Sequence, residues 1–200
     1  MPDAITPAQV SALRSRTGVG IMDCKRALEE AGGNVDKAAD LLRERGIARA
    51  AARAERVTAE GAVGSYIHLG GRIGVLLELN CETDFVARTP EFLELVKDLA
   101  MQVAAAHPTY VDAGSVPEAV LEHEREVLTN FTRSEGKPEA SLLKIVEGRL
   151  KTFFKEQCLL QQEYIKDPKL TVADRIRQTQ AKVGENIVVK RFSRFEVGEK

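Results

Sequence analysis

The spacing of apolar residues changes near Gly61, and this change most constrains the fold. Before it, apolar side chains recur three or four positions apart, as on one face of a helix. After it, Val63, Ser65 and Ile67 lie two positions apart, and 73–79 keeps the same period, so the sequence predicts two strands. Further helical patterns separate these strands from a last one. We therefore predict an α+β fold with an antiparallel sheet packed by helices.

The first 46 residues predict a bundle of three short helices. Thr6 to Gln9 has the capping-box pattern, with Pro7 at the first helical position. Glycine accepts the left-handed backbone that follows a helix, so Gly18, Gly33 and Gly46 are the expected stops. The side chains expected to face inward are Val10, Leu13, Ile21, Cys24, Leu28, Ala31, Val35, Ala38, Leu41 and Leu42.

Residues 47–60 alternate alanines with Arg49, Arg53 and Arg56. Ala and Arg are strong helix formers, which favours a solvated helical linker, and a basic docking surface is the alternative. The predicted organisation is a bundle at 1–46, a basic helical linker at 47–60 and a core domain at 61–200. Within the core we expect a hairpin turn at 69–72, helices at 90–106 and 172–183, a helical hairpin at about 115–156, and a strand at 187–195.

The charge balance excludes several classes of function. The chain of 200 residues has 29 Lys and Arg against 30 Asp and Glu, whereas general nucleic-acid binders are strongly basic. The longest apolar stretch, 73–77, is far shorter than the roughly 18 residues of a membrane span. Asp3 stands where a targeting signal would be basic. We expect a cytoplasmic protein that binds neither membrane nor nucleic acid directly.

Few residues are available for covalent or metal chemistry. No phosphate-binding loop, nucleophile elbow or His-Glu-x-x-His pattern occurs. Cys24, Cys81 and Cys158 are far apart and odd in number, which indicates reduced thiols. The three histidines, at 68, 107 and 123, lack a close ligand pair, so a metal site with Glu82 or Asp84 is disfavoured. We expect no cofactor, no metal and no enzymatic activity.

The segment from Asn80 to Ala87 is the most unusual in the chain. It follows an apolar strand and precedes a helix start at Thr89-Pro90, so it is predicted to be a connecting loop. Asp84 and Phe85 lie side by side in it. In one interpretation Asp84 caps the turn and Phe85 fills the core. In the other, the loop presents an acid and an aromatic side chain to a partner, as functional loops often do.

Several motifs resemble those of the translation elongation factor Ts family. Residues 17–28 (TGVGIMDCKRAL) are similar to its first signature and residues 81–87 (CETDFVA) to its second. Further similar patterns stand in the family's order and cover nearly the whole chain. They are Gly64 to His68, Arg72 to Val75, Gly136 to Pro138, Glu147 to Arg149 and Gly184 to Ile187. The length resembles the short form of the family, with room for one core lobe.

This resemblance implies a guanine nucleotide exchange factor for elongation factor Tu. In the family, an Asp-Phe pair enters the GTPase beside its nucleotide site and disturbs the bound magnesium, which promotes GDP release. The matching segment here is Thr83, Asp84, Phe85 and Val86. The first 46 residues resemble the family's ubiquitin-associated-like domain. The other contacts that the resemblance implies are Arg14, Ile21, Met22, Lys25, His68, Ile165, Lys166, Val183 and Gly184.

Some alternatives remain open at this stage. Ile21 and Met22 fit either a contact surface or the bundle core, and Gly184 can be only a helix stop. The resemblance to short-form members implies a homodimer. The last strand near residues 191–196 is a candidate for symmetric pairing. An adaptor module built on the bundle is a second hypothesis. A hydrolase using Asp84 and His68 is a third.

Overall fold

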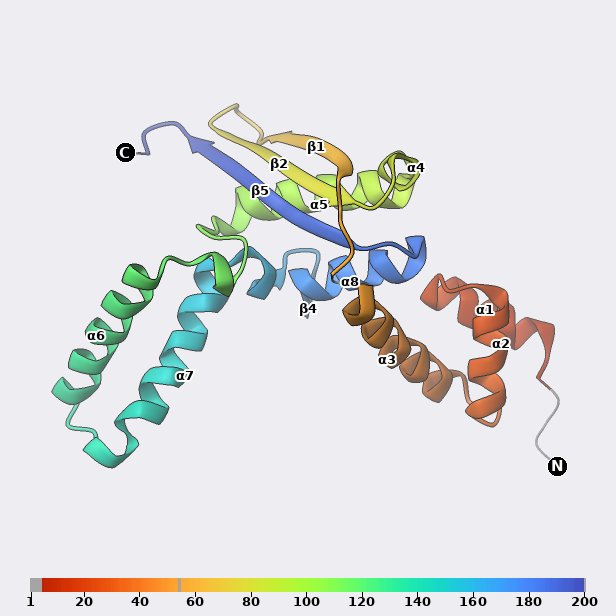
Figure 1. The fold of residues 1–200 in the computed structure, drawn as a ribbon, viewed down its shortest axis with the longest axis horizontal. Coiled ribbons are helices and arrows are strands. Elements are labelled where there is room, and N and C mark those ends of the chain that lie inside the picture. The colour runs from red at the N-terminus through yellow and green to blue at the C-terminus, as the bar shows by residue number, and fades with distance from the viewer. Residues whose placement is uncertain (1–4, 54, 200) are drawn as a thin grey trace. The chain divides into compact units, whose positions relative to one another are not determined.

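The computed structural model describes residues 5–53 and 55–199 and has a mixed helix-and-sheet fold (Figure 1). Asp3 and residue 54 lie outside the described residues. The chain forms two compact units, each assembled from separate segments. The first comprises the described parts of Met1–Gly61 with Cys81–Phe92 and Ile176–Val188. The second comprises Ala62–Asn80, Leu93–Arg175 and the described part of Val189–Lys200.

Three helices form the predicted N-terminal bundle: α1 (Pro7–Thr17), α2 (Ile21–Glu30) and α3 (Val35–Arg53). Thr6 caps α1 in a complete capping box with Gln9. The buried core consists of Leu13, Cys24, Ala27, Leu28, Ala38 and Leu42. Ile21 does not belong to this core, because Ile21 is 54% exposed. The prediction that Ile21 faces inward is therefore wrong, since it stands at the first position of α2.

The third helix does not end at Gly46 as predicted, because α3 continues to Arg53. A single glycine inside a helix costs only about 1 kcal/mol relative to alanine. The Ala-Arg stretch that follows favours helix strongly enough to offset that cost. The side chains of residues 47–52 lie outside what the structure describes, so the docking surface considered for this stretch stays a prediction.

A three-stranded sheet has the order β1-β2-β5, with β1 at Glu60–Ile67, β2 at Ile73–Cys81 and β5 at Ile187–Glu196 (Figure 1). The predicted hairpin turn joins β1 to β2 through Gly70 and Gly71. Their φ angles of 87° and 68° lie in the left-handed region that glycine tolerates best. Both strands and their turn therefore confirm the prediction from the period of two.

Helix α5 (Pro90–Ala106) lies along one face of this sheet (Figure 1). A Cβ atom at Gly64 of β1 would lie 2.1 Å from Cγ1 of Val96, so only glycine allows this close approach. The apolar face of α5 is buried throughout, at Phe92, Leu95, Val96, Leu99 and Val103, and the helix confirms the prediction for 90–106.

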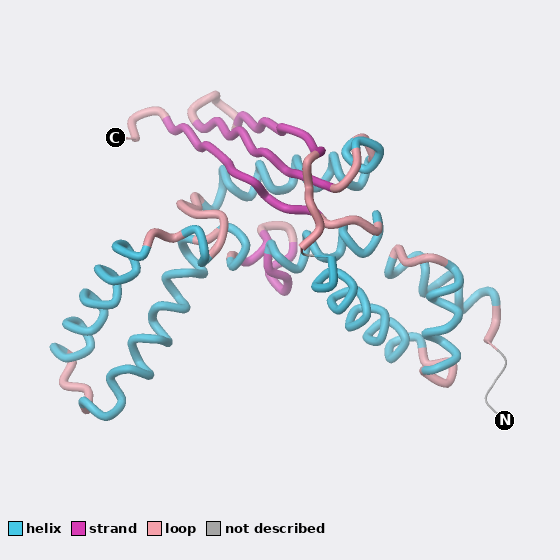
Figure 2. The backbone as a smooth tube through the Cα atoms, viewed as in Figure 1, coloured by secondary structure: helices cyan, strands magenta, loops and turns pink. Residues whose placement is uncertain are grey.

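Two antiparallel helices, α6 (Glu118–Ser134) and α7 (Glu139–Gln157), stand where a helical hairpin was predicted (Figure 2). A short 3-10 turn, η1 (Ala113–Ser115), precedes them. The small core at their base contains Val116, Leu121, Leu150 and Cys158. Phe131 of α6 is exposed, and the Arg149 guanidinium lies 4.7 Å above its ring. A cation over an aromatic face stabilises that exposed position.

A second, two-stranded sheet lies between α7 and the last helix, and no pattern in the sequence predicted it. After the 3-10 turn η2 (Leu159–Gln161), β3 (Glu163–Tyr164) pairs antiparallel with β4 (Asp167–Thr171). These strands are too short to show a period of two. The last helix, α8 (Val172–Val183), has the predicted bounds. The three cysteines are free and buried, and burial raises the pKa of Cys81 and Cys158 to about 11.

Candidate partner-binding site

The segment between β2 and α5 forms a single helical turn, α4 (Asp84–Ala87). We call residues 83–86 the Phe85 turn. Thr83 is the N-cap, and its hydroxyl accepts a hydrogen bond from the backbone N–H of Val86 at 3.4 Å. The cap is therefore Thr83, and the expectation that Asp84 caps the turn is wrong. The Asp84 carboxylate instead pairs with Arg88 at 2.9 Å on the surface.

Phe85 is 78% exposed, so the interpretation that it fills the core is wrong. Val86 and Ala87, the next two residues, are buried and anchor the turn. A helical turn places consecutive side chains about 100° apart, which allows Val86 to face inward while Phe85 faces outward. Burying a large apolar side chain yields about 1.5–3 kcal/mol, so an exposed Phe beside an acid suits a partner that covers it.

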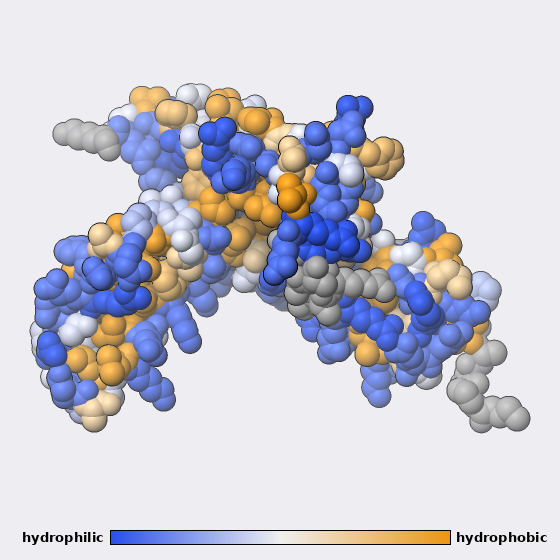
Figure 3. Space-filling view, in the orientation of Figure 1, coloured by the Kyte–Doolittle hydropathy of each residue, from blue (hydrophilic) through white to orange (hydrophobic). Residues whose placement is uncertain are grey.

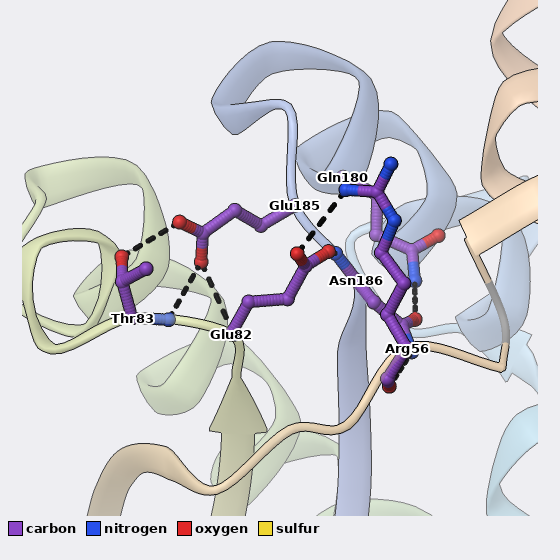
Figure 4. A network of polar contacts seen from close by, with 6 residues as sticks. All are labelled: Arg56, Glu82, Thr83, Gln180, Glu185 and Asn186. Carbon is purple, nitrogen blue, oxygen red and sulfur yellow. Dashed lines mark hydrogen bonds and ion pairs between the residues drawn. The ribbon is translucent and has the colours of Figure 1, made fainter.

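Glu185, which follows α8, binds the start of the Phe85 turn (Figure 4). One carboxylate oxygen accepts hydrogen bonds from the backbone N–H groups of Glu82, at 3.1 Å, and Thr83, at 3.0 Å. The other oxygen accepts from the Thr83 hydroxyl at 2.6 Å. All of these residues lie in the first unit. A single carboxylate thus joins two segments that are about a hundred positions apart in the sequence.

Glu82 makes the reciprocal connection. Its carboxylate accepts from the backbone N–H of Asn186 at 2.7 Å and from the Arg56 guanidinium at 3.2 Å (Figure 4). The hydrogen bond from Asn186, together with Arg56, holds the pKa of Glu82 below its usual value. The Asn186 side chain donates to the Arg56 carbonyl at 3.2 Å and accepts from Gln180 at 3.1 Å. We call the six residues drawn in Figure 4 the cross-brace: Arg56, Glu82, Thr83, Gln180, Glu185 and Asn186.

The turn that ends α8 lies between two members of the cross-brace, Gln180 and Glu185. Gly184 has a φ of 81°, and its N–H bonds to the Gln180 carbonyl at 2.9 Å, so it is indeed a helix stop. The predicted contact residues Val183 and Gly184 therefore precede Glu185 directly. From the sequence, Glu82 was considered only as a disfavoured metal ligand, and no role was predicted for Glu185. The sequence signal for Glu185 was its position directly after the helix-ending Gly184, within the family motif Gly184 to Ile187.

The predicted contacts of the bundle lie at its surface. Met22 is 65% exposed, and Arg14, Ile21 and Lys25 are exposed as well. Lys25 stands 3.8 Å from Glu29, a pair one helical turn apart. The interpretation that Ile21 and Met22 belong to the bundle core is thus wrong, because both residues are exposed. These four residues belong to the same unit as the Phe85 turn.

The remaining predicted contacts, His68, Ile165 and Lys166, belong to the second unit and are exposed. His68 directly follows β1, and its Nδ1 lies 3.0 Å from the Tyr66 hydroxyl. Ile165 and Lys166 form the turn between β3 and β4. The Ile165 N–H donates to the Gln102 side chain at 2.9 Å, which ties the turn to α5.

Asp98 of α5 binds the same turn from the buried side. It is 2% exposed, and its carboxylate accepts from Tyr164 at 2.7 Å, from Lys166 at 2.6 Å and from Arg175 at 3.1 Å. Burial alone would raise the pKa of Asp98, but these three donors outweigh burial and hold it below its usual value. We call Asp98, Tyr164, Lys166 and Arg175 the Asp98 cluster.

Among the described residues, no three His, Cys, Asp or Glu side chains gather as a metal site would require. Asp84 pairs with Arg88, whereas His68 has Tyr66 as its neighbour. In the part of the chain that the structure describes, no helix is long and apolar enough to cross a bilayer. The surface view shows apolar and charged side chains interspersed on the face drawn (Figure 3). The exposed groups at this site suit recognition of another macromolecule.

Comparison with known proteins identifies the family. The sequence profile described as Elongation factor TS matches residues 31–199. The chain is 58% identical over 195 residues to Elongation factor Ts of Thermoanaerobacter sp. (strain X514), covering 98% of this chain and 96% of that relative. It is 56% identical to Elongation factor Ts of Desulfitobacterium hafniense (strain DSM 10664 / DCB-2), covering 98% and 90% of the two chains. It is 57% identical to Elongation factor Ts of Moorella thermoacetica (strain ATCC 39073 / JCM 9320), covering 98% and 96%. The chain therefore belongs to the elongation factor Ts family.

Proposed function

We propose that this chain is a guanine nucleotide exchange factor for elongation factor Tu in translation elongation. Family membership supports the assignment, and the exposed Phe85 beside Asp84 is the single observation that carries it. The chain forms and breaks no covalent bond in this role and needs no cofactor or metal of its own. It works in the cytoplasm, and it contacts neither a membrane nor nucleic acid directly.

In the proposed mechanism the Phe85 turn enters the GTPase near its magnesium and nucleotide site. Phe85 gains free energy when the partner covers it, and this gain offsets the displacement of the elements that hold magnesium. Without magnesium, the phosphate charges of GDP are poorly compensated, so GDP leaves faster. Factor and GDP then weaken each other's binding by the same factor, as linkage requires. GTP can bind afterwards.

The other predicted residues supply affinity in this proposal. Arg14, Ile21, Met22 and Lys25 form the contact surface of the bundle, and Val183 and Gly184 form a second contact beside the Phe85 turn. Three further contacts come from the second unit: His68, Ile165 and Lys166. Thr83 and Val86 act through the turn, since Thr83 caps it and Val86 is its buried anchor.

Release of a fluorescent GDP analogue from purified elongation factor Tu tests the proposal. The wild-type chain is expected to accelerate release strongly. For a double variant, Asp84→Ala with Phe85→Ala, the acceleration is expected to be at least about tenfold smaller than for the wild type. Phe131→Ala is the matched control, because Phe131 is also an exposed aromatic residue but lies on α6. If the wild-type chain gives no acceleration with a matched Tu, the assignment is wrong.

We also propose that the chain is a homodimer. β5 is at the edge of its sheet, and Phe195 and Val197 expose apolar surface near its end. A groove of about 480 Å³ beside them has Ile67, Leu76, Phe195 and Val197 among its lining residues. A two-fold pairing near residues 191–196 would bring identical apolar patches together. Sedimentation equilibrium is expected to give a dimer for the wild type and a monomer for Phe195→Asp, and a wild-type monomer would refute the pairing.

A further inference from the structure

The Phe85 turn is too short to hold its own conformation. α4 has four residues, and a single helical turn is unfavourable in isolation because nucleation fixes several residues for one hydrogen bond. Phe85 itself contributes little to the fold, since it is exposed. Other contacts must therefore hold the aromatic side chain in one place before a partner arrives.

Glu185 supplies these contacts at the first residues of the turn. Three donors converge on its carboxylate: two backbone N–H groups and the Thr83 hydroxyl. Hydrogen bonds to a charged acceptor are about twice as strong as neutral ones. The same carboxylate belongs to the residue that follows Gly184, so it links the Phe85 turn to the end of α8.

The link is stiff in both directions. Glu82 accepts the N–H of Asn186, so each of two neighbouring segments binds the backbone of the other through a glutamate. Arg56 and Gln180 hold the Glu82–Asn186 side of this arrangement. Two reciprocal carboxylate-to-backbone bridges restrain sliding and rotation of one segment against the other better than one bridge would.

We propose that Glu185 is a positioning residue that couples the Phe85 turn to the Val183–Gly184 turn, so that elongation factor Tu meets the two segments as one rigid surface. This inference rests on the proposed function and deepens it. Glu185 acts through Phe85 and need not touch the partner. Its contribution is made when Phe85 enters the partner, so it raises the maximal rate of GDP release more than the affinity.

A double-mutant cycle between Glu185→Gln and Phe85→Ala tests this coupling. Glutamine keeps the size of the side chain but loses the charge and one acceptor. In the wild-type background, Glu185→Gln is expected to lower the maximal rate of release about tenfold and to change the half-saturating concentration less than about twofold. In the Phe85→Ala background, the same substitution is expected to lower the maximal rate less than about twofold. Glu139→Gln, in an ion pair on α7, is the control and is expected to have no effect.

The outcomes separate the inference from the proposed function. An equal loss in both backgrounds would mean that Glu185 supports the fold in general, and the coupling would be refuted. No acceleration by the wild-type chain would refute the exchange function instead. In that case, amide hydrogen exchange of the free chain still tests positioning, since exchange at Glu82 and Thr83 is expected to rise in Glu185→Gln only. Unchanged amide hydrogen exchange at Glu82 and Thr83 would refute the positioning role of Glu185. If Glu185→Gln fails to fold, Thr83→Val removes one of the three donors and carries the same cycle.

Discussion

Two carboxylates, Asp98 and Glu185, each join segments that are distant in the sequence, but their surroundings differ. Asp98 is 2% exposed and accepts from a phenol and two cations within the second unit. Glu185 lies in a partly exposed place in the first unit and accepts mainly from backbone N–H groups of an exposed turn. Both satisfy their donors, so hydrogen-bond count does not distinguish them.

Burial decides what each carboxylate does. Removing Asp98 would take its carboxylate away from the partly buried Arg175 guanidinium and the buried Tyr164 hydroxyl, which costs stability of the whole unit. Removing the Glu185 carboxylate would leave N–H groups that water can reach and bind. The expected loss is therefore confined to the ordered conformation of the Phe85 turn. The Asp98 cluster therefore stabilises the architecture of its unit, whereas the cross-brace holds one exposed turn.

The largest expected effect concerns stability. Asp98→Ala is expected to lower the free energy of unfolding by about 3 kcal/mol, because the partly buried Arg175 guanidinium loses the carboxylate that balances its charge. Asp84→Ala, which removes an exposed carboxylate, is expected to change it by less than about 0.5 kcal/mol. Urea unfolding followed by circular dichroism measures both. If the two variants unfold at the same urea concentration, burial does not distinguish these carboxylates.

Acid should weaken the Asp98 cluster next. The pKa of Asp98 is held below its usual value of 3.8 in the folded chain, so the unfolded chain takes up the proton first as pH falls. The stability that Asp98 contributes is present above pH 3.8 and is lost as pH falls through the folded pKa. Urea unfolding between pH 7 and roughly pH 3 is expected to show a smaller loss in Asp98→Asn than in the wild type. Parallel losses would show that other groups dominate the acid response.

The helix cap of the Phe85 turn should show a smaller and local effect. Thr83→Val keeps the shape but removes the hydroxyl that caps Val86 and binds Glu185, a loss of about 1 kcal/mol. Amide hydrogen exchange at Val86 is expected to rise roughly fivefold, and the global free energy of unfolding is expected to fall by no more than about 1 kcal/mol. Thr83→Ser, which keeps the hydroxyl, is the control. A fall in the global free energy of unfolding well above about 1 kcal/mol in Thr83→Val would contradict a local role.

The sequence predicted the elements with a clear period or clear end signals. The apolar face of α5, the β1–β2 hairpin and the bounds of α8 all have such signals. It did not predict β3 and β4, which are two and five residues long and are held by side chains of α5 rather than by their own pattern. Gly46 failed as a stop because neighbouring alanines and arginines outweigh one glycine.

The candidate site shows a similar division. Asp84 and Phe85 stood out because they lie side by side in a segment that directly follows an apolar strand, and only the structure shows that Phe85 is exposed. The partners Glu82 and Glu185 could not be paired from the sequence, since 103 positions separate them. A contact of this kind depends on how β2 and β5 lie beside each other in the sheet, and no local pattern encodes that order.

The smallest expected effect separates the bundle surface from the Phe85 turn. Met22→Ala removes an exposed apolar side chain from α2, so the free energy of unfolding is expected to change by less than about 0.5 kcal/mol. In the proposed exchange reaction, this contact forms on docking and persists, so its loss raises the half-saturating concentration about threefold and leaves the maximal rate unchanged. Titration of the factor against elongation factor Tu with bound GDP analogue measures both parameters. Ser11→Ala, at an exposed position of α1, is the control and is expected to change neither. A fall in the maximal rate in Met22→Ala would mean that the bundle takes part in nucleotide release, and the division between docking by the bundle and release by the Phe85 turn would not hold.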